Sequence, residues 1–391
     1  MPSKNKTNRK KKNAINRRKC ATIRKNGVIE GKKTTVVLGA FIRFLVNFEQ
    51  DIVDLIIFFL QTVHRISKYS KVMDLSLSLD PFDNLVVCVP REITDIVINA
   101  FYGCTSLNKI TLPPNLVVIG SYAFLGCTFL TKIALPPNVV VIGSYAFDAC
   151  SSLTKITLSS GLGAIGRYAF RGCASLTKIT LPSGLQSIES YAFDACSSLT
   201  KIILPPGIII IREFTFSGCS SLTKITLPLN LVAIGAFAFS GCSSLTTVVF
   251  PPALAEIGPY AFCGCTSLIS VKLPSSLTKI RTRTFCGCTS LTEITMPPGL
   301  VDIKKCAFFK CTSLTTVSLP SGLVEIGAYA FYSCSAVLNV VLPPGIVEIG
   351  EGAFSRCKSL PEITVPPSVT HLVRNIVTRP TVMKWKWKKK K

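Results

Sequence analysis

The sequence predicts an α/β repeat solenoid of about twelve coils with an N-terminal helical cap, and three observations support this fold class. Cysteine recurs every 23 residues from Cys104 to Cys357, without an insertion or a deletion. A phenylalanine stands three residues before each of these cysteines, from Phe101 to Phe354. Each unit also contains a run of alternating apolar residues followed by a turn signal, as in Leu107, Ile110 and Leu112.

Each unit is expected to contain a strand of about five residues, because alternating apolar side chains suit a half-buried strand that proline ends. The column after the prolines begins Asn115, Asn138, Gly161, Gly184, Gly207 and Asn230. We predict a tight turn with positive φ there. The following stretch, Leu116 to Phe124, predicts a short extended segment that leads into a helical turn. Stacked copies would share one continuous core, roughly 60 Å long at a strand spacing of ~4.8 Å.

The repeat pattern LxxIxLPxxLxxIGxxAFxxCxS resembles the BspA-type leucine-rich repeat of the 23-residue class, over about residues 84–372. The resemblance implies a curved leucine-rich-repeat solenoid that serves adhesion or protein recognition. Such proteins are often found on the cell surfaces of bacteria and protists. The resemblance also implies that the chain has no enzymatic activity of its own.

Four segments are expected along the chain: a disordered basic tail at 1–33, an amphipathic helical N-terminal cap at 34–72, the solenoid at 73–373 and a second disordered basic tail at 374–391. A solenoid exposes apolar surface at its ends unless a cap covers it. The apolar residues of 36–66 follow helical spacing, and Glu49, Asp51 and Asp54 favour a cap over a transmembrane span. A secretory signal around Val36 to Ile42 is a further alternative.

The net charge of +24 is concentrated at the two ends, which carry +12 and +8 and leave about +4 for the residues between them. Basic residues with interleaved tryptophans suit nucleic-acid or anionic-membrane contact, although a solvated tail is the alternative. The candidate residues are Arg9, Lys10, Lys11, Lys12, Arg17, Arg18, Lys19, Trp385 and Trp387.

Seventeen cysteines but only two histidines, His64 and His371, leave little for a classical metal site or a histidine-based relay. We therefore expect no metal and no cofactor. The periodic cysteines fit small buried core residues better than disulfides. Two CxC pairs, Cys263 with Cys265 and Cys286 with Cys288, leave a four-sulfur zinc site as the alternative.

One column of the predicted strands is lysine six times running, and alternation turns it away from the core. Its members are Lys109, Lys132, Lys155, Lys178, Lys201 and Lys224. Further along, the column becomes neutral to acidic, with Thr247, Ser270 and Glu293. We predict that this strip binds an acidic protein segment or another polyanion. The alternative is repeat duplication that copied a solvated lysine.

The leading functional prediction is a non-enzymatic scaffold that binds a protein ligand through the exposed sheet face. The sequence contains no recognisable nucleophile and base pair, phosphate-binding glycine loop or paired catalytic carboxylates. A nucleic-acid-associated protein bound through its basic tails and a surface or secreted adhesin are the alternatives. Without a convincing signal or anchor, an intracellular location in the cytoplasm or nucleus is expected over the cell surface.

Overall fold

The computed structural model describes residues 76–79, 85–89, 91–365 and 384–387. All of them belong to one compact unit, Leu60–Lys391. The predicted tail at 1–33 and the predicted cap at 34–72 lie outside these residues, so both stay predictions. For Trp385 and Trp387 only the backbone is described.

The repeats form a β-solenoid of about eleven turns with a spacing of 23 residues, and the described residues contain no helix. The predicted helical turn in each coil is therefore wrong, and so is the α/β class for this part of the chain. The physical reason for the missing helical turn is visible at Tyr145. Its φ of 58° lies in the left-handed region, which a right-handed helix cannot use. Its backbone N–H donates to Arg167 in the next coil at 2.8 Å, where a helix would bond four residues back.

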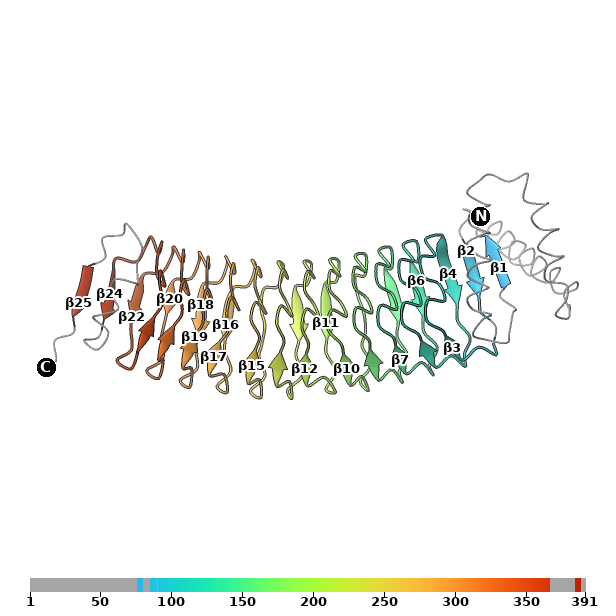
Figure 1. Cartoon of the computed structure of the whole chain (residues 1–391), viewed down its shortest axis with the longest axis horizontal. Helices are drawn as coiled ribbons and strands as arrows, with labels where there is room; N and C mark the ends of the chain where they lie inside the picture. The colour runs from blue at the N-terminus through green and yellow to red at the C-terminus, as the bar shows by residue number, and fades with distance from the viewer. Residues whose placement is uncertain (1–75, 80–84, 90, 366–383, 388–391) are drawn as a thin grey trace, which may run out of the picture. The chain divides into compact units, whose positions relative to one another are not determined.

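The first face of the solenoid carries a column of short strands that pair in parallel from coil to coil (Figure 1). Lys132, Ile133 and Ala134 pair with Lys155, Ile156 and Thr157, so each residue faces its equivalent 23 positions later. These strands are β2 (Leu85–Cys88), β4 (Leu107–Thr111), β6 (Lys132–Ala134), β8 (Lys155–Thr157), β11 (Lys201–Ile203), β13 (Lys224–Thr226), β16 (Ser270–Lys272), β18 (Glu293–Thr295), β20 (Thr316–Val317), β22 (Asn339–Val341) and β24 (Glu362–Val365).

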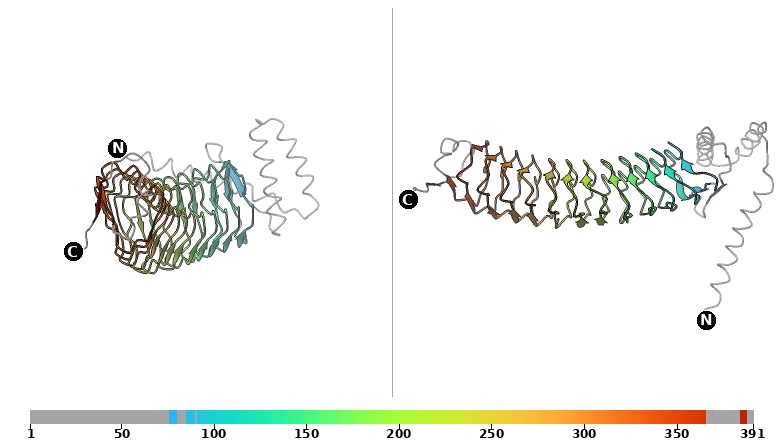
Figure 2. Two further views of the ribbon diagram at one scale, coloured as in Figure 1. Left: turned by 60° about the vertical axis from the view of Figure 1, so that its left-hand side comes forward. Right: turned by 90° about the horizontal axis from the view of Figure 1, so that it is seen from below.

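The second face carries two-residue strands in the same parallel register, and Figure 2 shows the coils from two further directions. They are β3 (Asp95–Ile96), β5 (Val118–Ile119), β7 (Val141–Ile142), β9 (Ala164–Ile165), β10 (Ser187–Ile188), β12 (Ile210–Ile211), β14 (Ala233–Ile234), β15 (Glu256–Ile257), β17 (Lys279–Ile280), β19 (Asp302–Ile303), β21 (Glu325–Ile326) and β23 (Glu348–Ile349).

One further strand stands at each end of the first-face column. β1 (Ser76–Leu79) pairs antiparallel with β2. β25 (Lys384–Trp387), which falls inside the segment predicted as the second tail, pairs parallel with β24. These four residues thus form a strand, whereas 366–383 and 388–391 lie outside the described residues.

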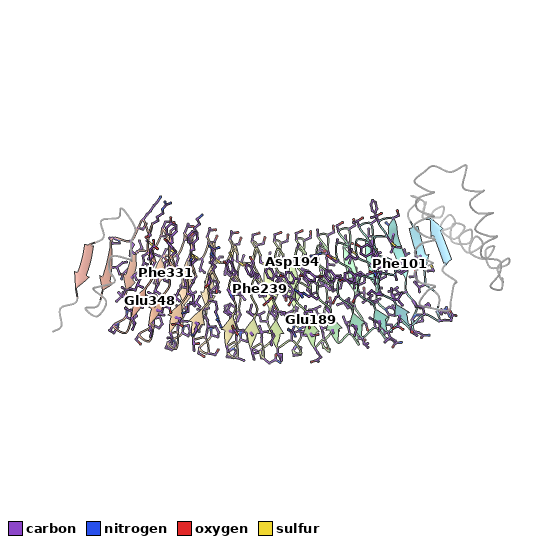
Figure 3. The ribbon with its side chains drawn as sticks, in the orientation of Figure 1. Phe101, Glu189, Asp194, Phe239, Phe331 and Glu348 are labelled. Atoms are coloured by element: carbon purple, nitrogen blue, oxygen red, sulfur yellow. The ribbon has the colours of Figure 1, made fainter. Side chains whose placement is uncertain are left out.

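The core is a set of aligned columns of leucine, isoleucine, phenylalanine and cysteine, most of them wholly buried. Rings of successive coils stack, as at Phe124 and Phe147, whose centroids lie 5.1 Å apart. Figure 3 marks Phe101, Phe239 and Phe331 along this column. The buried cysteine thiols donate to backbone carbonyls, for example Cys150 Sγ to the Phe124 oxygen at 3.1 Å. The periodic cysteines are free thiols packed in the core, as predicted.

The column that begins at Asn115 does not adopt the positive φ predicted for it. Its asparagines instead donate their side-chain amides to the preceding coil, as Asn230 Nδ2 does to the Pro206 oxygen at 2.8 Å. Left-handed φ values occur at the tyrosine column, including Tyr122 and Tyr145, and at glycines such as Gly126. Asparagine is thus favoured here for its hydrogen bond to the neighbouring coil.

Candidate binding face

The six predicted lysines form one continuous ladder on the first face, and we call Lys109, Lys132, Lys155, Lys178, Lys201 and Lys224 the lysine ladder. Each member pairs in register with the next, through strands or through isolated bridges at Lys178. All six side chains are exposed. Neighbouring members stand one strand spacing apart, ~4.8 Å.

Threonines beside the lysine ladder hold the backbone of this face in place. Thr223 Oγ1 donates to the Thr200 oxygen at 3.1 Å, and Thr200 Oγ1 donates to the Thr177 oxygen at 3.2 Å. Their hydroxyls are therefore engaged along the stack. None of the ion pairs among the described residues includes a member of the lysine ladder.

The lysine ladder ends at Lys224, and the next position of the column is Thr247, which bridges Lys224 on one side and Ser270 on the other. The next member of the column, Glu293, pairs with Ser270 and is exposed. The first face thus has a basic half and a neutral to acidic half in one unbroken register. Binding by the lysine ladder stays a prediction.

The second face carries a charged column that the sequence reasoning missed, running from Glu256 through Lys279, Asp302 and Glu325 to Glu348, which Figure 3 marks. Four of its five members form ion pairs, either with each other or with Arg281 and Lys304 of a neighbouring column. Lys279 Nζ lies 3.1 Å from Asp302, and Lys304 Nζ lies 2.6 Å from Glu325. Hydrogen bonding to Glu325 raises the pKa of Lys304. Most charges of this column therefore have an opposite charge beside them, whereas no ion pair among the described residues includes the lysine ladder.

A ladder of partly exposed aromatic rings was also missed, although a column-wise reading of the tyrosines could have found it. Tyr145 and Tyr168 stack with centroids 4.5 Å apart, and the stack continues through Tyr191 to Phe214. Because each ring face is covered by the next ring, the ladder offers edges and leaves no open face for a ligand to stack on. We assign it a structural role.

The four sulfurs of the two CxC pairs lie in two different environments. Cys265 and Cys288 are buried, and their thiols donate to the carbonyls of Phe239 and Phe262 at 3.2 Å. Cys263 and Cys286 are only half-buried. Since the buried thiols are engaged with core carbonyls, the arrangement gives the zinc alternative no support. No group of three or more histidine, cysteine or acidic side chains in the described part of the chain is placed to hold a metal ion.

The basic tail residues lie outside the described residues or have no described side chains, so their contact with nucleic acid or membrane stays a prediction. No helix in the described part of the chain is long and apolar enough to cross a membrane.

Comparison with known proteins gives matches in family and in structure. A model of the BspA-type leucine-rich repeat region matches residues 85–196, 163–289 and 255–379. A leucine-rich repeat protein from Bacteroides ovatus is 28% identical, with 82% of this chain and 100% of that chain covered and a TM-score of 0.56. No match was found among curated proteins.

Two further solved structures share the repeat less closely. A leucine-rich cell surface protein from Faecalibacterium prausnitzii is 25% identical over 82% of this chain and 95% of its own, with a TM-score of 0.49. The pneumococcal vaccine antigen PcpA is 17% identical over 80% of this chain and 82% of its own, with a TM-score of 0.34. The family matches span residues 85–379, well over half of the sequence, and the chain therefore belongs to the BspA-type leucine-rich repeat family.

Proposed function

We propose that this chain is a non-enzymatic recognition solenoid that binds an acidic protein segment along the lysine ladder. One observation carries the proposal. Six exposed lysines stand in register without an ion pair among the described residues, while most charges of the second-face column form ion pairs. Membership of a repeat family built around recognition surfaces supports a scaffold over an enzyme.

The electrostatics of the lysine ladder favour an anionic occupant. Two ammonium groups ~5 Å apart repel each other by about 0.8 kcal/mol even in water. The fold accepts this cost five times in succession along the register. A ligand with carboxylates spaced along the ladder, over roughly 24 Å, would offset the repulsion between the lysines and be attracted by their charge.

Display at a cell surface is the second candidate. It has more support from the family than the intracellular location predicted from the sequence, because membership of the BspA-type family favours surface adhesion. Both candidates use the same face of the same solenoid. Labelling of intact cells with a membrane-impermeant reagent tests display, since only a displayed chain would be labelled.

Charge reversal within the lysine ladder tests the binding proposal. The full chain and a variant with Lys132→Glu, Lys155→Glu and Lys178→Glu would be titrated with a synthetic polyglutamate peptide by calorimetry. We expect the variant to bind at least about tenfold more weakly, because three favourable contacts become repulsive. The charge-matched control carries Lys272→Glu, Lys305→Glu and Lys358→Glu, which are exposed lysines outside the ladder.

The control removes the same net charge, so it should lose much less affinity than the ladder variant. Equal losses in the two variants would mean that net charge and not the ladder binds the peptide. Binding that is unchanged in both would assign the ladder to repeat duplication and leave the tails as the site of polyanion binding. Parallel titration with single-stranded nucleic acid at ~50 and ~200 mM salt would then measure that contribution.

A further inference from the structure

Cys263 and Cys286 differ from the other cysteines of the solenoid. They occupy the same position in two successive repeats, 23 residues apart. Both are half-buried, whereas the core cysteines from Cys104 to Cys357 are buried. The same column holds serine one coil earlier, at Ser240, and phenylalanine one coil later, at Phe309. Two accessible thiols therefore stand next to each other in this column.

The backbone around the two cysteines runs in close register. The preceding rings, Phe262 and Phe285, stack with centroids 5.6 Å apart. A Cβ built on the following residue, Gly287, would lie 3.8 Å from the Gly264 Cα. The Gly264 N–H donates to the Cys286 oxygen at 2.7 Å. One coil spacing of ~4.8 Å lies within the usual Cα separation of disulfide-bonded cysteines, about 4.4–6.8 Å.

The two thiols also interact directly, and the interaction makes them unequal. A hydrogen bond from Cys286 lowers the pKa of Cys263, and the positive charge of Arg283 lowers it further. The same hydrogen bond, followed by burial, raises the pKa of Cys286. A thiol with a lowered pKa beside a cation is the more reactive nucleophile. Cys263 is therefore suited to attack and Cys286 to act second.

The core thiols differ from Cys263 in both burial and pKa. Burial raises the pKa of Cys242 to about 12. Its Sγ donates to the Phe216 carbonyl at 3.2 Å inside the stack. Neighbouring core thiols are also one coil apart, so spacing alone does not distinguish the two sets. Exposure does, because Cys263 and Cys286 are half-buried and the core thiols are buried.

We propose that Cys263 and Cys286 form a redox-active dithiol, which a small-molecule disulfide oxidises to a disulfide bond between two neighbouring coils. The Cys263 thiolate attacks one sulfur of the oxidant, forms a mixed disulfide and releases the first small thiolate. The Cys286 sulfur, after losing its proton, attacks the Cys263 sulfur and releases the second. The oxidant is reduced to two thiols, which take up the two protons.

The new bond would tie one coil to the next on the outside of the core. Each coil of a solenoid is held mainly by its neighbours, so coils can open locally. A covalent bond between two coils restricts such opening at this point of the stack. The bond would leave the lysine ladder, which ends at Lys224, in place.

Glutathione provides the probe. The full chain would be equilibrated with several ratios of oxidised to reduced glutathione, trapped with N-ethylmaleimide and mapped by peptide mass spectrometry. We expect Cys263 and Cys286 to lose alkylation together and to appear as one cross-linked peptide pair. Cys265 and Cys288 should stay reduced until the chain is unfolded. The proposal is overturned if both thiols stay alkylated in excess oxidised glutathione, or if the bond joins two chains.

Single substitutions separate the two roles. Cys286→Ser should leave a persistent glutathione adduct on Cys263, because the second attack is lost. In the Cys263→Ser variant, the glutathione adduct on Cys286 should form more slowly than the adduct on Cys263 forms in the Cys286→Ser variant. Cys88→Ser, which removes an exposed thiol elsewhere, is the control and should leave the cross-link unchanged. A cross-link from Cys286 to Cys306, beside Arg283, would also contradict the assignment.

Discussion

Asp148 is a nearly buried carboxylate among the turns of the solenoid, and Arg171 of the next coil satisfies it. The guanidinium donates from Nε to Oδ1 at 3.0 Å and from Nη2 to Oδ2 at 2.7 Å. The Asp148 side chain is 4% exposed and that of Arg171 is 43% exposed. Hydrogen bonding to Asp148 raises the pKa of Arg171, which also lies 4.8 Å from the centroid of the Tyr168 ring.

Removing only the arginine should therefore cost more than removing both partners. Arg171→Ser leaves a buried carboxylate without its donor, and we expect a loss of ~1–3 kcal/mol in the free energy of unfolding. The double variant with Asp148→Ser should recover part of this loss, because Ser217 and Ser240 occupy the same column naturally. Denaturant unfolding of the three chains measures the difference. A double variant less stable than Arg171→Ser would contradict the interpretation.

Individual residues also show where the sequence was informative. The repeat predicts that Cys150 and Phe147 lie in the core and that Lys155 lies on the surface, as they do in the structure. Period and alternation dictate which face each residue takes. The Asp148–Arg171 pair was not foreseen, because both residues lie in a variable column and form a contact across two repeats. Comparison of that column between neighbouring coils would have revealed it.

At the scale of the single coil, glycine marks the places where backbones of two coils approach most closely. A Cβ added to Gly166 would lie 2.5 Å from the Gly143 carbonyl carbon and 2.6 Å from the Ser144 nitrogen. These are backbone atoms and cannot rotate away. A Cβ added to Gly184, by contrast, would have no heavy atom within 4 Å apart from those of its chain neighbours.

The two glycines therefore predict opposite effects of the same substitution. Gly166→Ala should destabilise the chain by ~1–3 kcal/mol, because the coils must move apart to accept a methyl group. Gly184→Ala should be neutral or stabilising by up to ~1 kcal/mol, because it restricts the unfolded chain without a clash. Thermal unfolding of the two variants measures both effects. Equal destabilisation would show that the close approach at Gly166 is not limiting.

The helical turn was the element that the sequence predicted wrongly. The apolar spacing from Leu116 to Phe124 suits either a helical turn or a bent extended segment, and periodicity alone does not separate the two over so few residues. The structure resolves this through hydrogen bonding between coils, as where the Phe124 N–H donates to the Ala146 oxygen at 2.7 Å. Such a bond depends on the neighbouring coil, which a single repeat does not contain.

At the scale of the whole solenoid, the column of core thiols makes stability depend on pH. Burial raises the pKa of eleven of them. For Cys242 and Cys357 the raised pKa is about 12. In the unfolded chain a cysteine ionises near pH ~8.5. Between these values the unfolded chain has lost protons that the folded chain keeps.

The sign of the effect follows from this difference. A group whose pKa is raised by folding contributes its full stability below the unfolded pKa and loses it as the pH rises toward the folded pKa. Each thiol then removes about 1.4 kcal/mol per pH unit. Eleven thiols together would remove about 15 kcal/mol per pH unit, as much as the whole stability of an ordinary domain. We expect unfolding well below pH 12.

Melting of the reduced chain between pH 7 and 10 measures this dependence. The melting temperature should be nearly level up to pH ~8 and then fall steeply, because protons leave only the unfolded chain. A variant with Cys173→Ala and Cys196→Ala starts from a lower melting temperature but should fall less steeply, since two ionising groups are gone. Identical slopes in the two chains would locate the alkaline sensitivity elsewhere. A shallower slope would mean that the thiols that pack the core also set its alkaline limit.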